Sequence, residues 1–195
     1  MTDHVREGIF RVGLWMVESW KGPQLNFLVL VERFKMKYLY VMRHGDAEVC
    51  NFDLDDFDRG LSESGSKKVR EVAERFAQEA ESIELLVSST AKRAFDTAKL
   101  WVLHSGMVAQ AIRTDSKIYR AKSADLLKLI ASIDEGVDTL MLIGHNPGIT
   151  DLVSDLVGGR TISIPTSGVV RLLLPVANWF EVEFEKALTV SMDSI

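Results

Sequence analysis

Short apolar runs and amphipathic stretches alternate along most of the chain. Short apolar runs bounded by polar residues are typical of buried strands, and apolar positions at helical spacing are typical of amphipathic helices. The predicted strands lie at residues 38–42, 85–88, 112–114, 139–143, 169–174 and 180–184. The predicted helices lie at residues 62–81, 91–103 and 123–133, and a fourth begins at Asn146-Pro147. This order predicts an α/β domain with a largely parallel sheet.

Residues at the ends of these elements support the assignment. Ser62 is a favourable N-cap for the first helix. Asn146 is likewise a favoured cap, and Pro147 is favoured at the first helical position that follows it. The segment 175–178 lies between the last two predicted strands and predicts a hairpin, which adds an antiparallel strand to the sheet.

Composition and charge narrow the function classes. The chain has 195 residues and a net charge of −5, which predicts one main domain and disfavours a general nucleic-acid binder. A single cysteine, Cys50, excludes an internal disulfide and predicts a reduced intracellular protein. The longest apolar run, residues 25–31, is far shorter than the ~20 residues of a membrane span. Mixed charges at the N-terminus do not form a secretory signal, so we expect a cytoplasmic protein without membrane association.

One boundary lies near residue 36. Before it the alternation of strands and helices is missing, and after it an apolar strand begins at once. We therefore expect an N-terminal extension over residues 1–35 and one domain over residues 36–195. The extension is either a helix around residues 10–20 or sequence upstream of the true start codon, and the sequence does not choose between them.

Histidine and arginine side chains follow predicted strands or begin predicted helices at three places. Arg43 and His44 come directly after the first strand, Arg93 falls in the first turn of a helix, and His145 follows the strand at 139–143. Ligands of open α/β sheets bind at the carboxyl ends of the strands, so these side chains are expected to converge. An arginine suits phosphate oxygens, and a neutral histidine is a nucleophile at physiological pH.

Each of these residues taken alone has an ordinary structural explanation. The pair Arg43-His44 is as easily a solvated loop, because polar residues populate loops. Arg93 is as easily a solvated helix residue, and His145 a structural hydrogen-bonding group. Only their combination and order point to a common site.

The combination resembles the histidine phosphatase superfamily, also called phosphoglycerate mutase-like, and within it the short SixA-type phosphohistidine phosphatases. The resemblance covers residues 36–182, and its motifs lie at 40–48, 59–65, 88–98, 142–148 and 165–168. It implies a three-layer α/β/α sandwich with a mostly parallel sheet and one antiparallel strand. It also implies a phosphatase that needs neither metal nor cofactor and acts on a phosphorylated protein or a small phosphorylated substrate.

The resemblance further implies a role for each site residue. His44 would attack phosphorus and become phosphorylated, and water would then hydrolyse the phosphohistidine. Arg43 and Arg93 would clamp the phosphoryl oxygens, and His145 would donate to the same oxygens from the opposite side. The other implied substrate-binding residues are Gly45, Arg59 and Ser167.

The general acid is the part of the site that departs from the family pattern. Many members carry a glutamate where this chain has residues 115–122, a stretch without glutamate. Asp46 and Glu48 lie close to the nucleophile and are the next candidates. A phosphoramidate such as phosphohistidine needs less protonation to leave than an alkyl phosphate, so this departure favours a phosphohistidine substrate.

Two alternatives stay open at this point. The enzyme either hydrolyses phosphohistidine in a protein or acts on a small phosphorylated metabolite; a mutase is disfavoured because the chain is short. A different class, a phosphate-binding scaffold without turnover, would lack one of the four residues Arg43, His44, Arg93 and His145, and all four are present. The sequence does not determine the physiological substrate or the oligomeric state.

Overall fold

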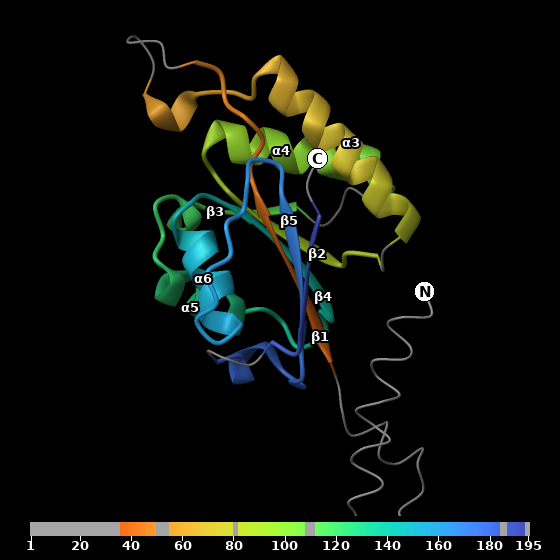
Figure 1. Ribbon diagram of the computed structural model, residues 1–195, viewed down its shortest axis with the longest axis vertical. Helices are drawn as coiled ribbons and strands as arrows, with labels where there is room; N and C mark the ends of the chain where they lie inside the picture. Colours follow the sequence, from red (N-terminus) through yellow and green to blue (C-terminus); the bar gives the residue numbers. More distant parts are fainter. Residues whose placement is uncertain (1–35, 50–54, 80–81, 108–111, 184–186, 194–195) are drawn as a thin grey trace, which may run out of the picture. The chain divides into compact units, whose positions relative to one another are not determined.

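The computed structural model describes residues 36–49, 55–79, 82–107, 112–183 and 187–193. The described strands form one six-stranded sheet in the order β3-β2-β4-β1-β5-β6 (Figure 1). They are β1 (Lys37–Arg43), β2 (Leu85–Ser89), β3 (Ile112–Asp115), β4 (Thr139–Gly144), β5 (Val169–Leu174) and β6 (Thr189–Asp193). β1 to β4 pair in parallel, whereas β5 runs antiparallel to both β1 and β6. The sheet is thus mostly parallel with one reversed strand, as predicted.

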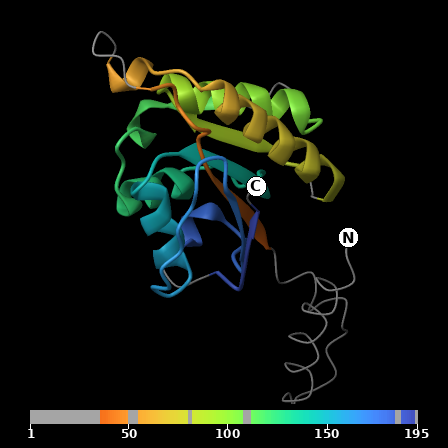
Figure 2. The ribbon, with the colours of Figure 1, turned by 45° about the horizontal axis from the view of Figure 1, so that its top comes forward.

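In the described part of the chain, helices cover both faces of the sheet (Figures 1 and 2). α3 (Glu63–Glu79) and α4 (Lys92–His104) pack together on one face, and α5 (Ser123–Ala131) and α6 (Gly148–Leu156) pack together on the other. The prediction of a three-layer α/β/α sandwich is confirmed. None of the helices in the described ranges is long and apolar enough to cross a membrane.

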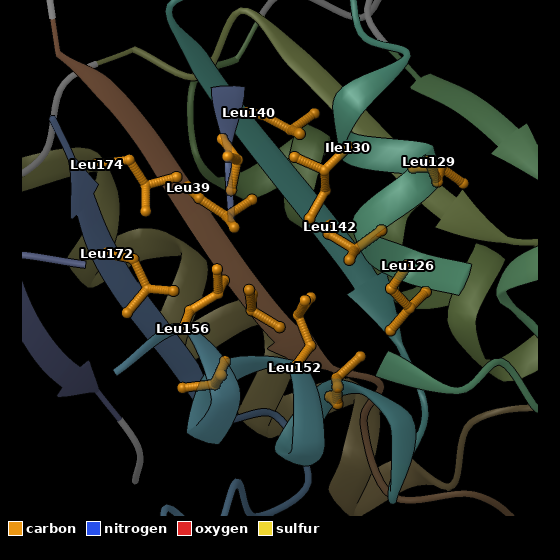
Figure 3. Packing of buried hydrophobic residues seen from close by; sticks show 14 of the residues in the cluster. Leu39, Leu126, Leu129, Ile130, Leu140, Leu142, Leu152, Leu156, Leu172 and Leu174 are labelled. Atoms are coloured by element: carbon orange, nitrogen blue, oxygen red, sulfur yellow. The ribbon is translucent and has the colours of Figure 1, made fainter. Parts of the chain in front are cut away.

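The alternation of side chains along the strands builds two separate cores. In β1, Leu39 and Val41 pack with α5 and α6, whereas Tyr40 and Met42 pack with α3 and α4. Figure 3 shows the leucine-rich core between the sheet and α5 and α6. Each fully buried leucine contributes about 1.5–3 kcal/mol of transfer free energy. Because both faces of the central strands are buried, the strands read as continuous apolar runs rather than as alternating ones.

Two sequence expectations about element ends are wrong. No strand forms over residues 180–183, and residue 184 of the predicted strand lies outside the described part. Residues Trp179–Glu181 form a short 3-10 helix, η4, and the last strand is β6. Aromatic Trp179 is fully buried against the core, so packing rather than strand pairing fixes this segment.

Asn146 does not cap α6: its side chain bonds Thr150 and the carbonyl of Ile164. The Ser62 cap is present, because its hydroxyl accepts the N–H of Gly65.

We propose that residues 1–35, which lie outside the described part, are an extension that the domain does not need to fold. The sheet and both helical layers are built from residues 37–193. The buried ammonium of Lys37 bonds two carbonyl oxygens and Asp138 and thereby anchors the start of β1. A chain that begins at Met36 is therefore expected to be soluble and fully active, as measured by thermal melting and turnover of an aryl phosphate. Aggregation of that chain would show that the extension covers the core.

Candidate functional site

The register of the sheet brings His44 and His145 together. β1 and β4 are adjacent parallel strands in which Arg43 lies opposite Gly144, so the residue after each strand is a histidine. The two imidazole rings lie with their centroids 4.8 Å apart. Arg93 reaches them from the first turn of α4, which follows the neighbouring strand β2. The carboxyl ends of three strands thus assemble residues that are far apart in the chain.

One hydrogen bond fixes the orientation of the His44 ring. Its Nδ1 lies 2.7 Å from the carbonyl oxygen of Gly45. A carbonyl oxygen only accepts, so Nδ1 carries the proton and Nε2 keeps its lone pair. Burial, aided by the charges of Arg93 and Arg43, lowers the pKa of His44 to about 4. The ring is therefore a neutral base whose unprotonated nitrogen, Nε2, faces the site.

Arg93 contacts both the nucleophile and an acidic loop. Its Nε donates to His44 Nε2 over 3.2 Å. Its terminal nitrogens bond the backbone carbonyl and the carboxylate of Asp56, the latter over 2.9 Å. Asp56 belongs to the 3-10 helix η1 (Asp56–Asp58). A phosphoryl group that binds Arg93 must therefore compete with this carboxylate.

Arg43 and His145 complete a ring of donors around the cleft. Arg43 donates from Nη1 to the carbonyl of Ile164, while its buried Nε has no hydrogen-bond partner within the described ranges. Both ring nitrogens of His145 are also buried without a hydrogen-bond partner among the described residues. Burial, together with the neighbouring His44 ring, lowers the pKa of His145 to about 3. Unpaired buried donors are costly, and an incoming phosphoryl oxygen would satisfy them.

Both histidines are expected to stay neutral as the pH falls from about 7.5 to about 5.5, a range in which an unperturbed imidazole becomes mostly protonated. Burial disfavours the charged ring, so each lowered pKa moves protonation to lower pH. Histidine NMR signals of the wild-type protein, assigned with His44→Ala and His145→Ala, would measure this. A midpoint near the ordinary histidine value for either ring would contradict the structure.

The loop that carries His44 packs closely against α3. A Cβ on Gly45 would lie 2.8 Å from a methyl carbon of Val69 and 3.1 Å from the carbonyl oxygen of Gly65. Only glycine fits this approach, and Gly45 contributes its backbone rather than a side chain to the site. Ser167, at φ 63°, donates its N–H to the carbonyl of His44 and so holds the other side of the same loop.

A cleft of about 430 Å³ opens over these groups. Arg59 lines it, but its guanidinium also bonds the carboxylate of Asp56 and the carbonyl of Glu48. The other lining residues are Arg43, His44, Asp46, Ala47, Arg93, His145, Asn146 and Thr166. The structure therefore brings together the four predicted catalytic residues, Arg43, His44, Arg93 and His145, and places Arg59 at the same cleft. The described residues hold no group of three or more His, Cys, Asp or Glu side chains arranged to bind a metal.

The two predicted candidates for the general acid have different surroundings. The Asp46 carboxylate accepts a hydrogen bond from the Thr166 hydroxyl and pairs with Lys68 over 3.4 Å. The Thr166 bond, aided by Lys68 and Arg43, lowers the pKa of Asp46. The Glu48 side chain lines a different cleft, between α3 and α4. Asp46 therefore lines the phosphate cleft as a carboxylate with a lowered pKa, whereas Glu48 is not among the residues that line this cleft.

Asp56 is the residue beside the site that the sequence did not single out. It lies in the acidic segment before Arg59, which reads from sequence as a solvated turn. In the structure its carboxylate accepts from Arg93, Arg59 and the Tyr119 hydroxyl. The proximity of these acidic residues to Arg59 was the available signal, but only the fold brings Tyr119 and Arg93 to them.

Comparisons with known proteins agree with this geometry. The family model of the histidine phosphatase superfamily, branch 1, matches residues 39–117. The chain is 30% identical to a candidate phosphohistidine phosphatase, SixA, of Agrobacterium tumefaciens, with a TM-score of 0.64 over 70% of this chain and 90% of that one.

Two more distant structures share the fold. The protein histidine phosphatase SixA in complex with tungstate is 24% identical, with a TM-score of 0.60 over 69% of this chain and 86% of that one. A mycobacterial glucosyl-3-phosphoglycerate phosphatase is 17% identical, with a TM-score of 0.57 over 82% of this chain and 98% of that one. The family match and the 30% identical relative carry the assignment. The chain belongs to the histidine phosphatase superfamily and is a phosphatase.

Proposed function

We propose that this phosphatase hydrolyses phosphohistidine in a protein through a covalent phosphohistidine on its own His44. The observation that carries the proposal is the neutral His44 ring, with its Nε2 lone pair facing a cleft that also holds Arg43, Arg93 and His145. An unprotonated Nε2 that accepts from Arg93 beside a second fixed cation, Arg43, suits phosphoryl transfer, which depends mostly on positioning and electrostatics.

The reaction has two steps. In the first, His44 Nε2 forms a bond to phosphorus as the bond from phosphorus to the leaving nitrogen breaks, and the leaving nitrogen takes up a proton. In the second, a water oxygen bonds to phosphorus, the bond from phosphorus to Nε2 breaks, and the water loses a proton. Arg43, Arg93 and His145 donate to the phosphoryl oxygens in both steps.

In the free protein the pKa of Asp46 and that of Asp56 are both lowered, so neither carboxyl is a ready proton donor, which supports phosphohistidine over an alkyl phosphate. Glu48 lines another cleft. A protonated imidazole leaves phosphorus easily, so such a substrate needs little help from an acid on the protein. The 30% identity to a candidate phosphohistidine phosphatase points the same way. Glucosyl-3-phosphoglycerate phosphatase, which shares the fold, shows that the fold alone does not select the substrate.

A substrate panel tests the proposal. It comprises a phosphohistidine protein, a sugar phosphate and an aryl phosphate, each with and without EDTA. The phosphohistidine protein is expected to give the highest kcat/KM, with EDTA having no effect. A higher kcat/KM for the sugar phosphate would replace the proposed substrate with a small metabolite, and inhibition by EDTA would contradict metal independence.

We further propose that Asp56, rather than Asp46, exchanges the proton with the leaving group. In the free protein burial raises the pKa of Asp56, but the Tyr119 hydrogen bond and the Arg93 charge outweigh burial and lower it. A bound phosphoryl group would draw Arg93 away and bring negative charge close, and both changes raise the pKa of the carboxyl. Asp46 keeps Thr166 and Lys68 as partners, so it gains no proton in this way.

Asp56→Asn is therefore expected to slow hydrolysis of alkyl phosphates by about 10²–10⁴-fold, the usual worth of general acid catalysis, and to affect aryl phosphates little. Asp46→Asn serves as the matched variant and is expected to change both substrate classes equally. Steady-state kinetics on an alkyl and an aryl phosphate measure the difference. If instead Asp46→Asn slows alkyl phosphates much more than aryl phosphates and Asp56→Asn does not, Asp46 is the acid.

A further inference from the structure

Four buried hydrogen bonds form a closed ring that joins the nucleophile to the arginine helix. His44 Nδ1–H donates to the Gly45 carbonyl over 2.7 Å, and the Gly45 N–H donates to Thr97 Oγ1 over 3.0 Å. The Thr97 hydroxyl donates to the Arg93 carbonyl over 2.7 Å. Arg93 Nε–H then donates to His44 Nε2 over 3.2 Å and closes the ring.

We propose that Thr97 is a positioning residue that holds the His44 ring in its reactive tautomer and at its distance from Arg93. The inference rests on the proposed covalent role of His44. Thr97 is fully buried and does not line the cleft, so it acts through Gly45 and Arg93 and not on the substrate. It is the only member of the ring that contributes a hydroxyl.

Gly45 explains why the ring needs this anchor. Glycine has the freest backbone of any residue, and its carbonyl is the acceptor that selects the His44 tautomer. The bond from its N–H to Thr97 anchors the peptide unit between His44 and Gly45, and thereby positions the Gly45 Cα from which the Gly45 carbonyl projects. Without Thr97 this unit keeps only the bond from the Ser167 N–H to the His44 carbonyl on its other side, so the Gly45 carbonyl can shift from Nδ1 and the proton can move to Nε2, the atom that must attack phosphorus.

A hydroxyl is required because the position both donates and accepts. Thr97 lies four residues after Arg93 on α4, so its O–H reaches the Arg93 carbonyl within the helix while its lone pair accepts from Gly45. Valine has the same shape but neither donates nor accepts. It leaves the Gly45 N–H and the Arg93 carbonyl without these partners in a buried place. Serine keeps both bonds.

The experiment compares Thr97→Val with Thr97→Ser in the full chain. Thr139→Val is the control. Thr139 is buried at the first residue of β4, whereas the site lies beyond the carboxyl end of that strand. Long-range ¹H–¹⁵N NMR of the imidazole reads the His44 tautomer without turnover. Aryl phosphate kinetics give kcat and KM, and thermal melting reports stability.

Thr97→Val is expected to shift the His44 signal toward the Nε2-protonated tautomer. It is also expected to lower kcat by about 10²-fold, the cost typical of a small misplacement of reacting groups. KM should change less than kcat, because Arg43 and His145 are not in the ring. Thr97→Ser and Thr139→Val should retain the wild-type tautomer and kcat. If Thr97→Val does not fold, the same comparison is made between Thr97→Ala and Thr97→Ser.

Two results separate this inference from the proposed function. An unchanged tautomer and kcat in Thr97→Val, or equal losses in Thr97→Val and Thr139→Val, would overturn the positioning role even in an active phosphatase. If the His44 tautomer changes in Thr97→Val but the protein forms no phosphoenzyme, the positioning role of Thr97 stands and the covalent role of His44 is rejected.

Discussion

Replacement of His44 by alanine is expected to abolish the phosphoenzyme and to reduce turnover by at least about 10⁴-fold, as removal of a covalent nucleophile does elsewhere. The reason is that Nε2 of this neutral ring is unprotonated and faces the cleft that Arg43 and Arg93 also line. Single-turnover experiments with a radiolabelled phosphoryl substrate measure both quantities. The label should be acid-labile and stable to alkali, as a phosphoramidate is.

His104→Ala is the matched control for this experiment. His104 lies at the end of α4 and bonds Glu74, away from the cleft. It is expected to keep wild-type turnover and labelling. Appreciable activity or acid-labile label in His44→Ala would exclude the covalent mechanism and leave direct attack by water as the alternative.

Replacement of Arg93 by lysine is expected to lower kcat by about 10²–10³-fold, although the positive charge remains, as loss of a preorganised donor does. The guanidinium contacts His44 Nε2 with one nitrogen and Asp56 with the other two, and it is almost fully buried. A lysine ammonium is a point charge that cannot keep this planar geometry toward phosphoryl oxygens. KM is expected to rise as well, because the lost contact binds the ground state too.

Arg70→Lys controls for the conservative substitution itself. Arg70 is an exposed residue of α3 whose Nε bonds the Ser66 carbonyl of the same helix. Steady-state kinetics of both variants on an aryl phosphate make the comparison. Similar kcat values for Arg93→Lys and the wild type would mean that charge alone, without the fork of donors, supports the reaction.

The sequence was sufficient for the architecture because the burial of both sheet faces leaves a strong local signal. β1, β2 and β4 each contain an uninterrupted apolar run, and the amphipathic helices show one apolar face each. The β5 strand was predicted to the residue, Val169–Leu174. The last strand was misplaced because residues 180–184 alternate apolar and acidic side chains as a half-buried strand does, whereas Trp179–Glu181 form a short 3-10 helix in which Trp179 is fully buried.

The sequence also located the residues that follow the strands. Arg43 is the last residue of β1, His44 and His145 directly follow β1 and β4, and Arg93 lies in the first turn of α4. Parallel pairing then brings the strand ends to one edge. That inference needed only the order of elements and the rule that parallel strands expose their carboxyl ends together. The mutual orientation of these side chains did not follow from it.

Only the tertiary structure decided how the site is held. Asp56 and Tyr119 are 63 positions apart, and Gly45 and Thr97 are 52 apart, yet each pair is joined by one hydrogen bond. The Nδ1-protonated form of His44 depends on the Gly45 carbonyl, and the lowered pKa values of both histidines depend on burial and on the nearby charges of Arg93 and Arg43. The sequence determined which chemical groups lie at the carboxyl ends of strands, because the positions of strands and helices along the chain are encoded locally in hydrophobic patterns. Tautomer, charge state and proton donor depend on distances between segments remote in the chain, which local patterns do not encode.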